Sequence, residues 1–443
     1  MKWTRHLLWV PLLVWTANGI AGETTVDNHQ QLAEQYYRQG LFPQAAEQYR
    51  IALEDAPTDS QTLFNLGLLA LWDNKPDISL DYLHRAYKQS GWLGQHWPFN
   101  AQIAYRIASA YYRKDDFAMA AKWYKKAVGP WAVGPLKTLK AFQQQAEAFA
   151  DSRPYQISGP QQTELPFVML DPLPVVEVSL NGHGPYAFFI DTGGGEVIIQ
   201  SELARELGIK ETGAFMGEFA ANKKGRVGLS RVDSLGLGEL TVRNLPVNLH
   251  TLEGTEAIFK RKVYGVIGTS LLRHFYSSID YRHQKLVLRQ VKHSTRSEME
   301  QLAKKAIAIP FWLIDYHMMM ARGHVDDLPE TLFFVDTGLA DSGFLLTQKT
   351  IHALGIEPEW NRAEESSGGG GKVRYLNIPL DRLTLGTGNQ SLTRTQVKAE
   401  LHESDLAIFQ GALGFDVDGL ISHDFFKGST VTLDFTNMRL LIE

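Results

Sequence analysis

Two aspartates occupy the same local setting at distant points of the chain. Asp191 and Asp336 each end an apolar, strand-like run, and each is followed by Thr-Gly: Ala187-Phe188-Phe189-Ile190-Asp191-Thr192-Gly193 and Leu332-Phe333-Phe334-Val335-Asp336-Thr337-Gly338. One carboxylate on a turn does little chemistry, whereas two brought together can share a proton and activate a water molecule. The repeat therefore predicts a catalytic pair. Turn capping, which Asp often does in such settings, is the alternative for either residue taken singly.

The sequence around the two motifs is itself duplicated. Matching landmarks keep their order while their separation grows slowly from 144 to 154 residues: Leu165-Pro166-Phe167 with Ile309-Pro310-Phe311, Leu207-Gly208-Ile209 with Leu354-Gly355-Ile356, and Gly265-Val266-Ile267-Gly268 with Gly419-Leu420-Ile421-Ser422. Short β-branched and aromatic runs broken by Gly and Pro favour strands throughout this region. We expect two copies of one all-β fold, a first lobe at 165–290 and a second at 309–443, joined by a linker at 291–308.

These motifs resemble the pepsin/retropepsin class of aspartic peptidases, and the strand patterns after the apolar pairs resemble bacterial retropepsin-like domains in particular. The resemblance implies a single-chain, two-lobed enzyme in which Asp191 and Asp336 meet and the Thr192 and Thr337 hydroxyls link the two loops. Gly193 and Gly338 would permit a sharp turn and a close approach. The ionised Asp would take a proton from water while the protonated one polarises the scissile carbonyl. The resemblance implies no metal and no cofactor. Pairing of lobes in a homodimer is unnecessary given the complete duplication.

Flaps are expected between each Asp-Thr-Gly and the following Asp-x-Leu-x-Leu-Gly. The candidates are 219–225 and 367–373, with Phe219, Gly225, Gly370 and Gly371 as candidate substrate-binding positions. Packing is the alternative role for Phe219. The run Ser366 to Lys372 looks superficially like a phosphate loop, but Val373 stands where a hydroxyl residue is required.

Two departures concern the second lobe above all. Ser422 stands where Gly is expected after the apolar pair, which puts its packing against the Asp336 loop in question. Gly194 and Leu339 stand where pepsin-like enzymes carry a hydroxyl residue. Fewer hydrogen bonds to the carboxylates should depress their pKa values less, so we expect a pH optimum nearer neutral than strongly acidic.

The region 30–150 is helical and repetitive. Small and aromatic residues recur at a spacing of 34, as in Ala45, Tyr49 and Ala52 against Ser79, Leu83 and Ala86. The pattern resembles tetratricopeptide repeats. This resemblance implies a surface for a peptide or partner protein, and a spacer packed on the rest of the chain is the equal alternative. Residues 151–164, with Pro, Gly, Gln and Ser, are expected to form an interdomain linker.

The N-terminus predicts export. Lys2, Arg5 and His6 precede an apolar stretch from Leu7 to Trp15 and then small residues, the pattern of a signal peptide at 1–21. An uncleaved anchor is the alternative. The chain has no cysteine, which excludes disulfides and a cysteine nucleophile. We expect a bacterial periplasmic or secreted protein without a stable membrane span.

Composition excludes some classes of function. A net charge of −5 offers no basic surface for nucleic acid. The 14 histidines are scattered, and His274, His402 and His423 are expected to be surface or structural residues. The sequence thus predicts an exported aspartic endopeptidase acting on a peptide or protein, with repeats that recruit substrate or a partner. The alternative is a non-catalytic, peptide-binding scaffold.

Overall fold

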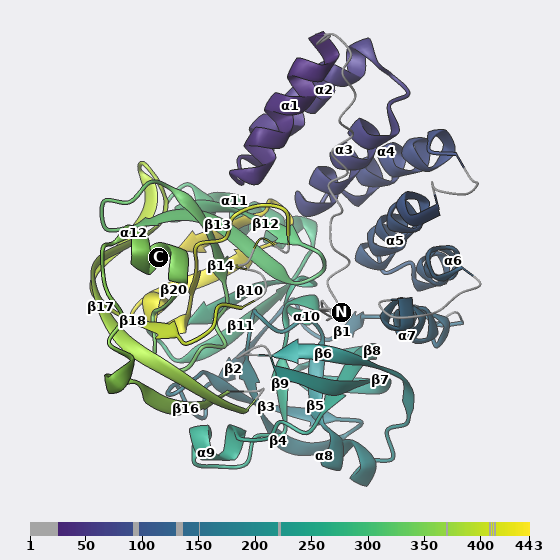
Figure 1. The fold of residues 1–443 in the computed structure, drawn as a ribbon. Helices are drawn as coiled ribbons and strands as arrows, with labels where there is room; N and C mark the ends of the chain where they lie inside the picture. Colours follow the sequence, from purple (N-terminus) through teal and green to yellow (C-terminus); the bar gives the residue numbers. More distant parts are fainter. Residues whose placement is uncertain are drawn as a thin grey trace, which may run out of the picture. The chain divides into compact units, whose positions relative to one another are not determined.

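The computed structural model describes residues 25–91, 97–129, 136–149, 151–219, 223–368, 371–406, 409, 411 and 413–443. The described chain forms two compact units, one helical and one mainly β (Figure 1). The predicted signal peptide lies outside the described residues. Within them, no helix combines the length and apolar character needed to cross a membrane.

The helical unit is built from consecutive helices. They are α1 (Thr25–Arg38), α2 (Phe42–Asp55), α3 (Ser60–Trp72), α4 (Pro76–Gln89), α5 (Trp97–Arg113), α6 (Phe117–Val128) and α7 (Leu136–Glu147). Two of the helices, α3 and α6, begin at aspartate caps: Asp59 accepts a hydrogen bond from Thr62 N at 2.8 Å, and Asp116 accepts one from Met119 N at 3.0 Å. The repeated small residues, including Ala45, Ala52 and Ala120, are fully buried. The predicted helical repeats are therefore present.

Two short segments from later in the chain also belong to the helical unit: 213–217 and 410–416. Phe215 packs on Phe142 of α7 with ring centroids 5.4 Å apart. Phe415 completes an aromatic cluster with Phe42 and Trp72, whose centroids lie 5.1 and 5.6 Å away. Buried aromatic pairs of this kind contribute about 0.5–1.5 kcal/mol each beyond their area.

The β unit contains two copies of one strand order. The first copy comprises β1 (Gln156–Ser158), β2 (Gln162–Pro166), β3 (Val175–Leu180), β4 (His183–Ile190), β5 (Val197–Gln200), α8 (Ser201–Glu206), β6 (Glu211–Phe219), β7 (Lys223–Leu237), β8 (Leu240–His250), α9 (Thr255–Phe259), β9 (Gly265–Ile267), α10 (Thr269–Leu272), β10 (Phe275–Asp280) and β11 (Lys285–Gln290). After α11 (His293–Ala303), the second comprises β12 (Ile307–Ile314), β13 (Met318–Val325), β14 (Thr331–Val335), β15 (Phe344–Leu346), α12 (Gln348–Ala353), η3 (Trp360–Arg362), β16 (Glu364–Gly368), β17 (Gly371–Thr387), β18 (Gln390–His402), β19 (Gly419–Ile421), α13 (His423–Phe426), β20 (Thr430–Asp434) and β21 (Arg439–Ile442).

The pairing repeats with the strands. The first sheet has the order β1-β8-β5-β9-β4-β3-β7-β6, and the second contains β16-β17-β18-β15-β19-β14-β13-β12. In both, the strand before an Asp-Thr-Gly pairs in parallel with the apolar strand that follows later, β4 with β9 and β14 with β19. The two-lobed β fold expected from the duplication is the fold observed.

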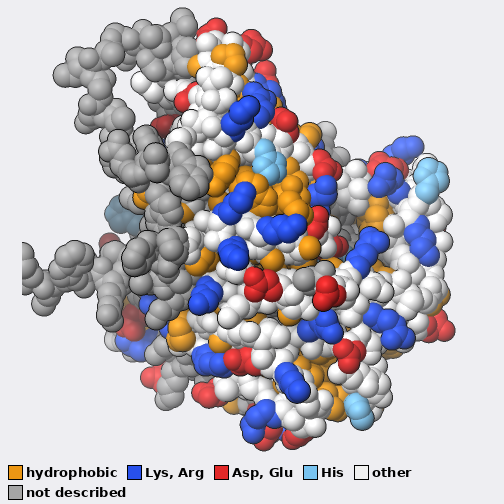
Figure 2. All heavy atoms as spheres, turned by 90° about the vertical axis from the view of Figure 1, so that its right-hand side faces the viewer, with side chains coloured by type: hydrophobic (Ala, Val, Ile, Leu, Met, Phe, Trp, Pro, Cys, Tyr) orange, Lys and Arg blue, Asp and Glu red, His pale blue; other side chains and the backbone are white. Residues whose placement is uncertain are grey.

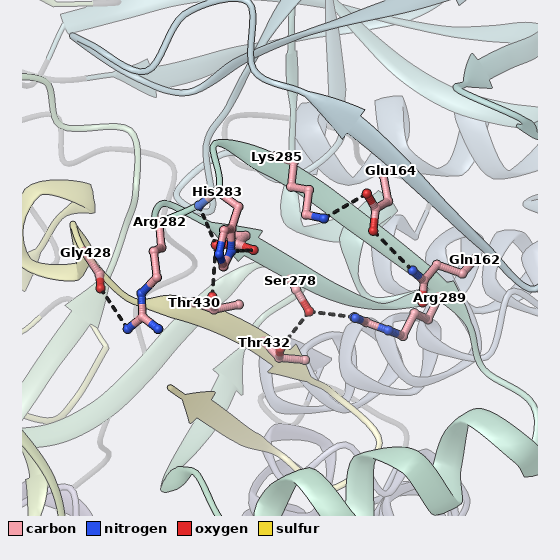
Figure 3. Close-up of polar contacts among 11 residues, drawn as sticks. Gln162, Glu164, Ser278, Arg282, His283, Lys285, Arg289, Gly428, Thr430 and Thr432 are labelled. Atoms are coloured by element: carbon pink, nitrogen blue, oxygen red, sulfur yellow. Dashed lines mark hydrogen bonds and ion pairs between the residues drawn. The ribbon is translucent and has the colours of Figure 1, made fainter.

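A six-stranded arrangement, β2-β11-β10-β20-β21-β12, joins the lobes. At its centre Ser278 pairs with Thr432, its own counterpart at a shift of 154 residues, which is the register that a local two-fold relation requires. Their hydroxyls are 2.6 Å apart, and Arg289 donates to Ser278 Oγ at 2.8 Å (Figure 3). Nearby, Asp280 accepts hydrogen bonds from the backbone and ring of His283 and from Thr430. The lobes are thus fixed to each other by backbone pairing.

The stretch 151–164, expected as a linker, carries strands instead. β1 pairs with β8, and β2 pairs with β11 on the edge of the joining sheet. Pro and Gly in this stretch punctuate the strands without preventing them. The interlobe stretch 291–308 holds α11 and the first residues of β12.

Candidate active site

Each site aspartate sits directly after a buried strand that is held by parallel pairing. Asp191 N donates to Ile267 O at 3.1 Å, and Asp336 N donates to Ile421 O at 2.9 Å. The acceptor in both cases ends the later apolar strand. The backbone of the aspartate is thereby fixed before the chain turns at Thr-Gly, so both lobes present a carboxyl group in the same way.

The two threonines join the two loops reciprocally. Thr192 N donates to Thr337 Oγ1 at 3.1 Å, and Thr337 N donates to Thr192 Oγ1 at 3.0 Å. Each hydroxyl also donates back across the lobe boundary, Thr192 to Val335 O at 3.1 Å and Thr337 to Ile190 O at 3.5 Å. Both residues are buried. This network accounts for polar groups that burial would otherwise leave unpaired.

The glycines of the two motifs let the carboxyl groups meet. A Cβ added to Gly193 would lie under 3.0 Å from the Asp336 carboxyl, and one added to Gly338 would lie equally close to that of Asp191. The Asp191 and Asp336 side chains are hydrogen-bonded to each other. The structure therefore brings Asp191, Thr192, Gly193, Asp336, Thr337 and Gly338 together.

The two carboxyls differ in their electrostatic surroundings. Burial raises the pKa of Asp191, and hydrogen bonds from Asp336, Gly193 and Gly194 oppose that rise. The two backbone donors reach its Oδ1 at 2.8 and 3.1 Å. Burial raises the pKa of Asp336 well above its usual value, and the negative charge of Asp191 raises it further. Both pKa values are raised, so the two carboxyls should hold one shared proton over a wide pH range, and the stronger rise at Asp336 favours protonation of that residue.

Ser422 fits its position because the second lobe has a longer loop. Asp336 is followed by β15 at Phe344, whereas Asp191 is followed by β5 at Val197, two residues sooner. Ser422 is fully buried, and its hydroxyl donates to Leu339 O at 2.6 Å. At the matching Gly268, a Cβ would lie under 3.0 Å from the carbonyl oxygens of 194–196. The hydroxyl thus has a partner that the first lobe could not offer.

The predicted flap positions fall on two hairpins. Phe219 ends β6, Gly225 lies in β7, and Gly371 begins β17, where it pairs with Gly368 of β16. Gly370 lies outside the described residues, as does the side chain of Phe219. β16 of the second lobe contacts α9 of the first. The substrate-binding role of these four residues stays a prediction.

One residue beside the site was not anticipated from the sequence. The ring of Tyr316, in the turn between β12 and β13, lies against Gly195 of the Asp191 loop. A shift of 144, the offset of the Pro-Phe landmarks, matches Tyr316 to Pro172 of the first lobe. The duplication could therefore predict where Tyr316 lies in the second lobe, but not that its ring contacts Gly195.

Comparisons with known proteins agree with both parts of the chain. Residues 176–274 match the family model described as "gag-polyprotein putative aspartyl protease", and residues 31–75 and 64–135 match a tetratricopeptide repeat model. The first match contains Asp191 but ends before Asp336. No curated protein matches the sequence.

Solved structures similar to this chain contain tetratricopeptide repeats. The N-terminal domain of stress-induced protein-1 from C. elegans is 17% identical, covering 27% of this chain and 94% of that one, with a TM-score of 0.24. The TPR2B domain of yeast Sti1, in a complex with pHsp70, is 14% identical, covering 28% and 96%, with a TM-score of 0.25. The Sgt2 TPR domain from Aspergillus fumigatus is 15% identical, covering 30% and 84%, with a TM-score of 0.25. By the two family models, the chain combines N-terminal tetratricopeptide repeats with an aspartyl-protease-type domain.

Proposed function

We propose that this protein is an aspartic endopeptidase that hydrolyses peptide bonds with a water molecule activated between Asp191 and Asp336. The observation that carries the proposal is the pair of hydrogen-bonded, differently tuned carboxyls on threonine-linked loops. Perturbed pKa values of paired acids are typical of acid–base sites.

The pKa of Asp336 is raised more strongly than that of Asp191, and this difference assigns the catalytic roles of the two residues. Asp191 would accept a proton as the water oxygen bonds to the scissile carbonyl carbon, and Asp336 would give its proton to the carbonyl oxygen. The resulting gem-diol would then collapse as Asp191 passes its proton to the leaving nitrogen, Asp336 takes back a hydroxyl proton and the C–N bond breaks. Because both pKa values are raised, the singly protonated pair should persist above the usual acidic range of carboxyls. A pH–rate profile peaking below about pH 3.5 would contradict this.

The decisive experiment is cleavage of a mixed peptide library by the full chain and by Asp191→Asn and Asp336→Asn. Each variant alone should lose about 10²–10⁴-fold in kcat/KM, since one site needs both groups. Asp233→Asn and Asp381→Asn are matched controls, because they remove one exposed carboxylate at equivalent positions of the two lobes. Residual cleavage in either site variant would reject a shared site, and an inert wild type would favour a peptide-binding scaffold.

We further propose that the helical repeats recruit a protein substrate or partner, and that the protein is exported to the periplasm or secreted. Figure 2 shows hydrophobic, basic and histidine side chains next to one another on one face of the molecule. Within the helical unit, Lys126 Nζ lies 3.7 Å from the centre of the largely buried Trp123 ring, and His84 and Tyr87 pack on the same ring. Lys126→Ala with Tyr87→Ala should raise KM for a protein substrate and leave short-peptide cleavage unchanged. Equal effects on both substrates would reject recruitment through this surface.

A further inference from the structure

A cluster of charged residues connects the two lobes outside the carboxyl pair. Asp171 precedes β3 in the first lobe, while His423, Asp424 and Lys427 lie in and after α13 of the second. Lys427 Nζ is 2.5 Å from Asp171 Oδ1 and 2.5 Å from Asp424 Oδ1. One ammonium group thus stands between two carboxylates, which leaves the trio with a net charge of −1.

His423 is directed into this cluster and lacks a hydrogen bond of its own. The residue is 0% exposed, and neither ring nitrogen has a hydrogen-bond partner among the described residues. Its Nε2 lies 3.0 Å from Asp424 Oδ1, although not in hydrogen-bonding geometry. A buried polar group without a hydrogen-bond partner destabilises a fold, so this imidazole calls for a partner.

We infer that Asp171, His423 and Asp424 form a binding site for a divalent transition-metal cation of the zinc class. One ligand atom from each of the three lies within 4.8 Å of the other two. One imidazole with two carboxylates is a donor set that suits Zn²⁺ or Co²⁺ better than Mg²⁺ or Ca²⁺, which prefer all-oxygen sites.

Lys427 is the competing cation. Its side chain is 36% exposed, so it can move into water when a metal enters. A divalent ion in place of the ammonium group would balance the two carboxylates and give the buried imidazole nitrogen a partner. This site is separate from the proposed peptidase chemistry, which uses neither His423 nor Asp171.

The test is a titration of the chelator-treated full chain with Zn²⁺ by calorimetry and with Co²⁺ by its visible absorption. We expect one ion per chain, with a dissociation constant below about 10 µM and a Co²⁺ spectrum showing a nitrogen ligand in a site of low coordination number. Mg²⁺ at the same concentrations should not bind. Absence of stoichiometric Zn²⁺ binding, or equal binding of Mg²⁺, would overturn the inference.

Variants assign the ligands. Asp171→Asn changes a side chain that is 63% exposed, so folding should be retained while Zn²⁺ affinity falls at least about tenfold. Lys427→Met removes the competing ammonium and should strengthen binding. Asp327→Asn, at a side chain that is 97% exposed, is the control for charge removal. Unchanged affinity in Asp171→Asn, or weaker binding in Lys427→Met, would overturn the assignment.

Discussion

The Asp191 and Asp336 loops reach the same geometry along chains of different length. Both aspartates use their N–H to bond the end of the later apolar strand, and both threonines cross to the other loop. Beyond these shared bonds the loops diverge. The first is short and glycine-rich and donates from both Gly193 and Gly194 to Asp191, whereas the second is longer and donates from Gly338 to Asp336 at 2.7 Å.

The difference separates what the pair requires from what each lobe can vary. The requirement is the carboxyl contact and the threonine exchange, which both loops supply. The variable part is the outer loop. In the first lobe its carbonyl oxygens pack closely against Gly268, whereas in the second lobe Leu339 O accepts a hydrogen bond from the Ser422 hydroxyl. Backbone N–H groups reach both carboxyls, those of Gly193 and Gly194 at Asp191 and those of Gly338 and Gly193 at Asp336, so the stronger rise of the Asp336 pKa comes from its burial and from the charge of Asp191.

Substituting Gly193 or Gly338, each of which packs against the carboxyl of the opposite lobe, should have the largest effect on activity. Gly193→Ala or Gly338→Ala should each lower kcat/KM by about 10²-fold or more, because the new methyl group must displace the opposite carboxyl. Peptidase kinetics with thermal unfolding would measure both consequences. Gly194→Ala is the matched control and should lose much less, since its Cβ would lie 3.4 Å from the nearest atom. Equal losses in all three would show that loop flexibility, and not the close approach, matters.

Exchanging the residue that follows the later apolar strand, Gly268 in the first lobe and Ser422 in the second, should cost more stability in the first lobe than in the second. Gly268→Ser should destabilise the protein by about 1–3 kcal/mol, because its Cβ would overlap three carbonyl oxygens. Ser422→Gly should cost about 1 kcal/mol, the value of the hydroxyl bond to Leu339 plus added chain freedom. Denaturant unfolding measures both. A larger cost for Ser422→Gly would mean that the second loop depends on its hydroxyl more than the first depends on its glycine.

The duplicated frame was predictable because its signals are local. An apolar run ending in Asp-Thr-Gly specifies a buried strand and a tight turn, and ordered landmarks specify a second copy. The fit of Ser422 was not predictable, because it depends on where the Leu339 carbonyl points. The strands at 151–164 were missed since short edge strands such as β1 and β2 are stabilised by distant partners, Val242 and Leu286 among them. The contact of Tyr316 with Gly195 was not predictable either, because it joins residues that are far apart in the sequence.

Thr192 and Thr337 should contribute slightly unequal amounts to the stability of the protein. Thr192→Val should cost about 1–3 kcal/mol, because it leaves the Thr337 N–H and the Val335 carbonyl without their partner in the interior. Thr337→Val should cost less, since the bond it loses to Ile190 O is long, at 3.5 Å. Thr192→Ser and Thr337→Ser keep the hydroxyl and serve as controls. Denaturant unfolding that ranks Thr337→Val as the more damaging would reverse this view of the two loops.

The smallest effect, and the finest probe of the two lobes, is the pH dependence of stability. A carboxyl whose pKa is raised by folding contributes its full stability below the unfolded pKa, and that stability is lost as the pH rises through the folded pKa. Both site carboxyls are of this kind, Asp336 more so. Asp336→Asn should therefore raise the melting temperature at pH 7 more than Asp191→Asn does, and the gain should vanish below about pH 4.

Asp280 should make stability change with pH in the direction opposite to that of the site carboxyls. Burial opposes its ionisation, but hydrogen bonds from His283 and Thr430 outweigh burial and hold its pKa below the usual value. Its stability is present above the unfolded pKa and is lost as the pH falls through the folded one. Asp280→Asn should thus lower the melting temperature at pH 7, with a smaller deficit in acid. If Asp336→Asn followed the same course as Asp280→Asn, the site carboxyls would be stabilised as anions, and the proton could not reside on Asp336.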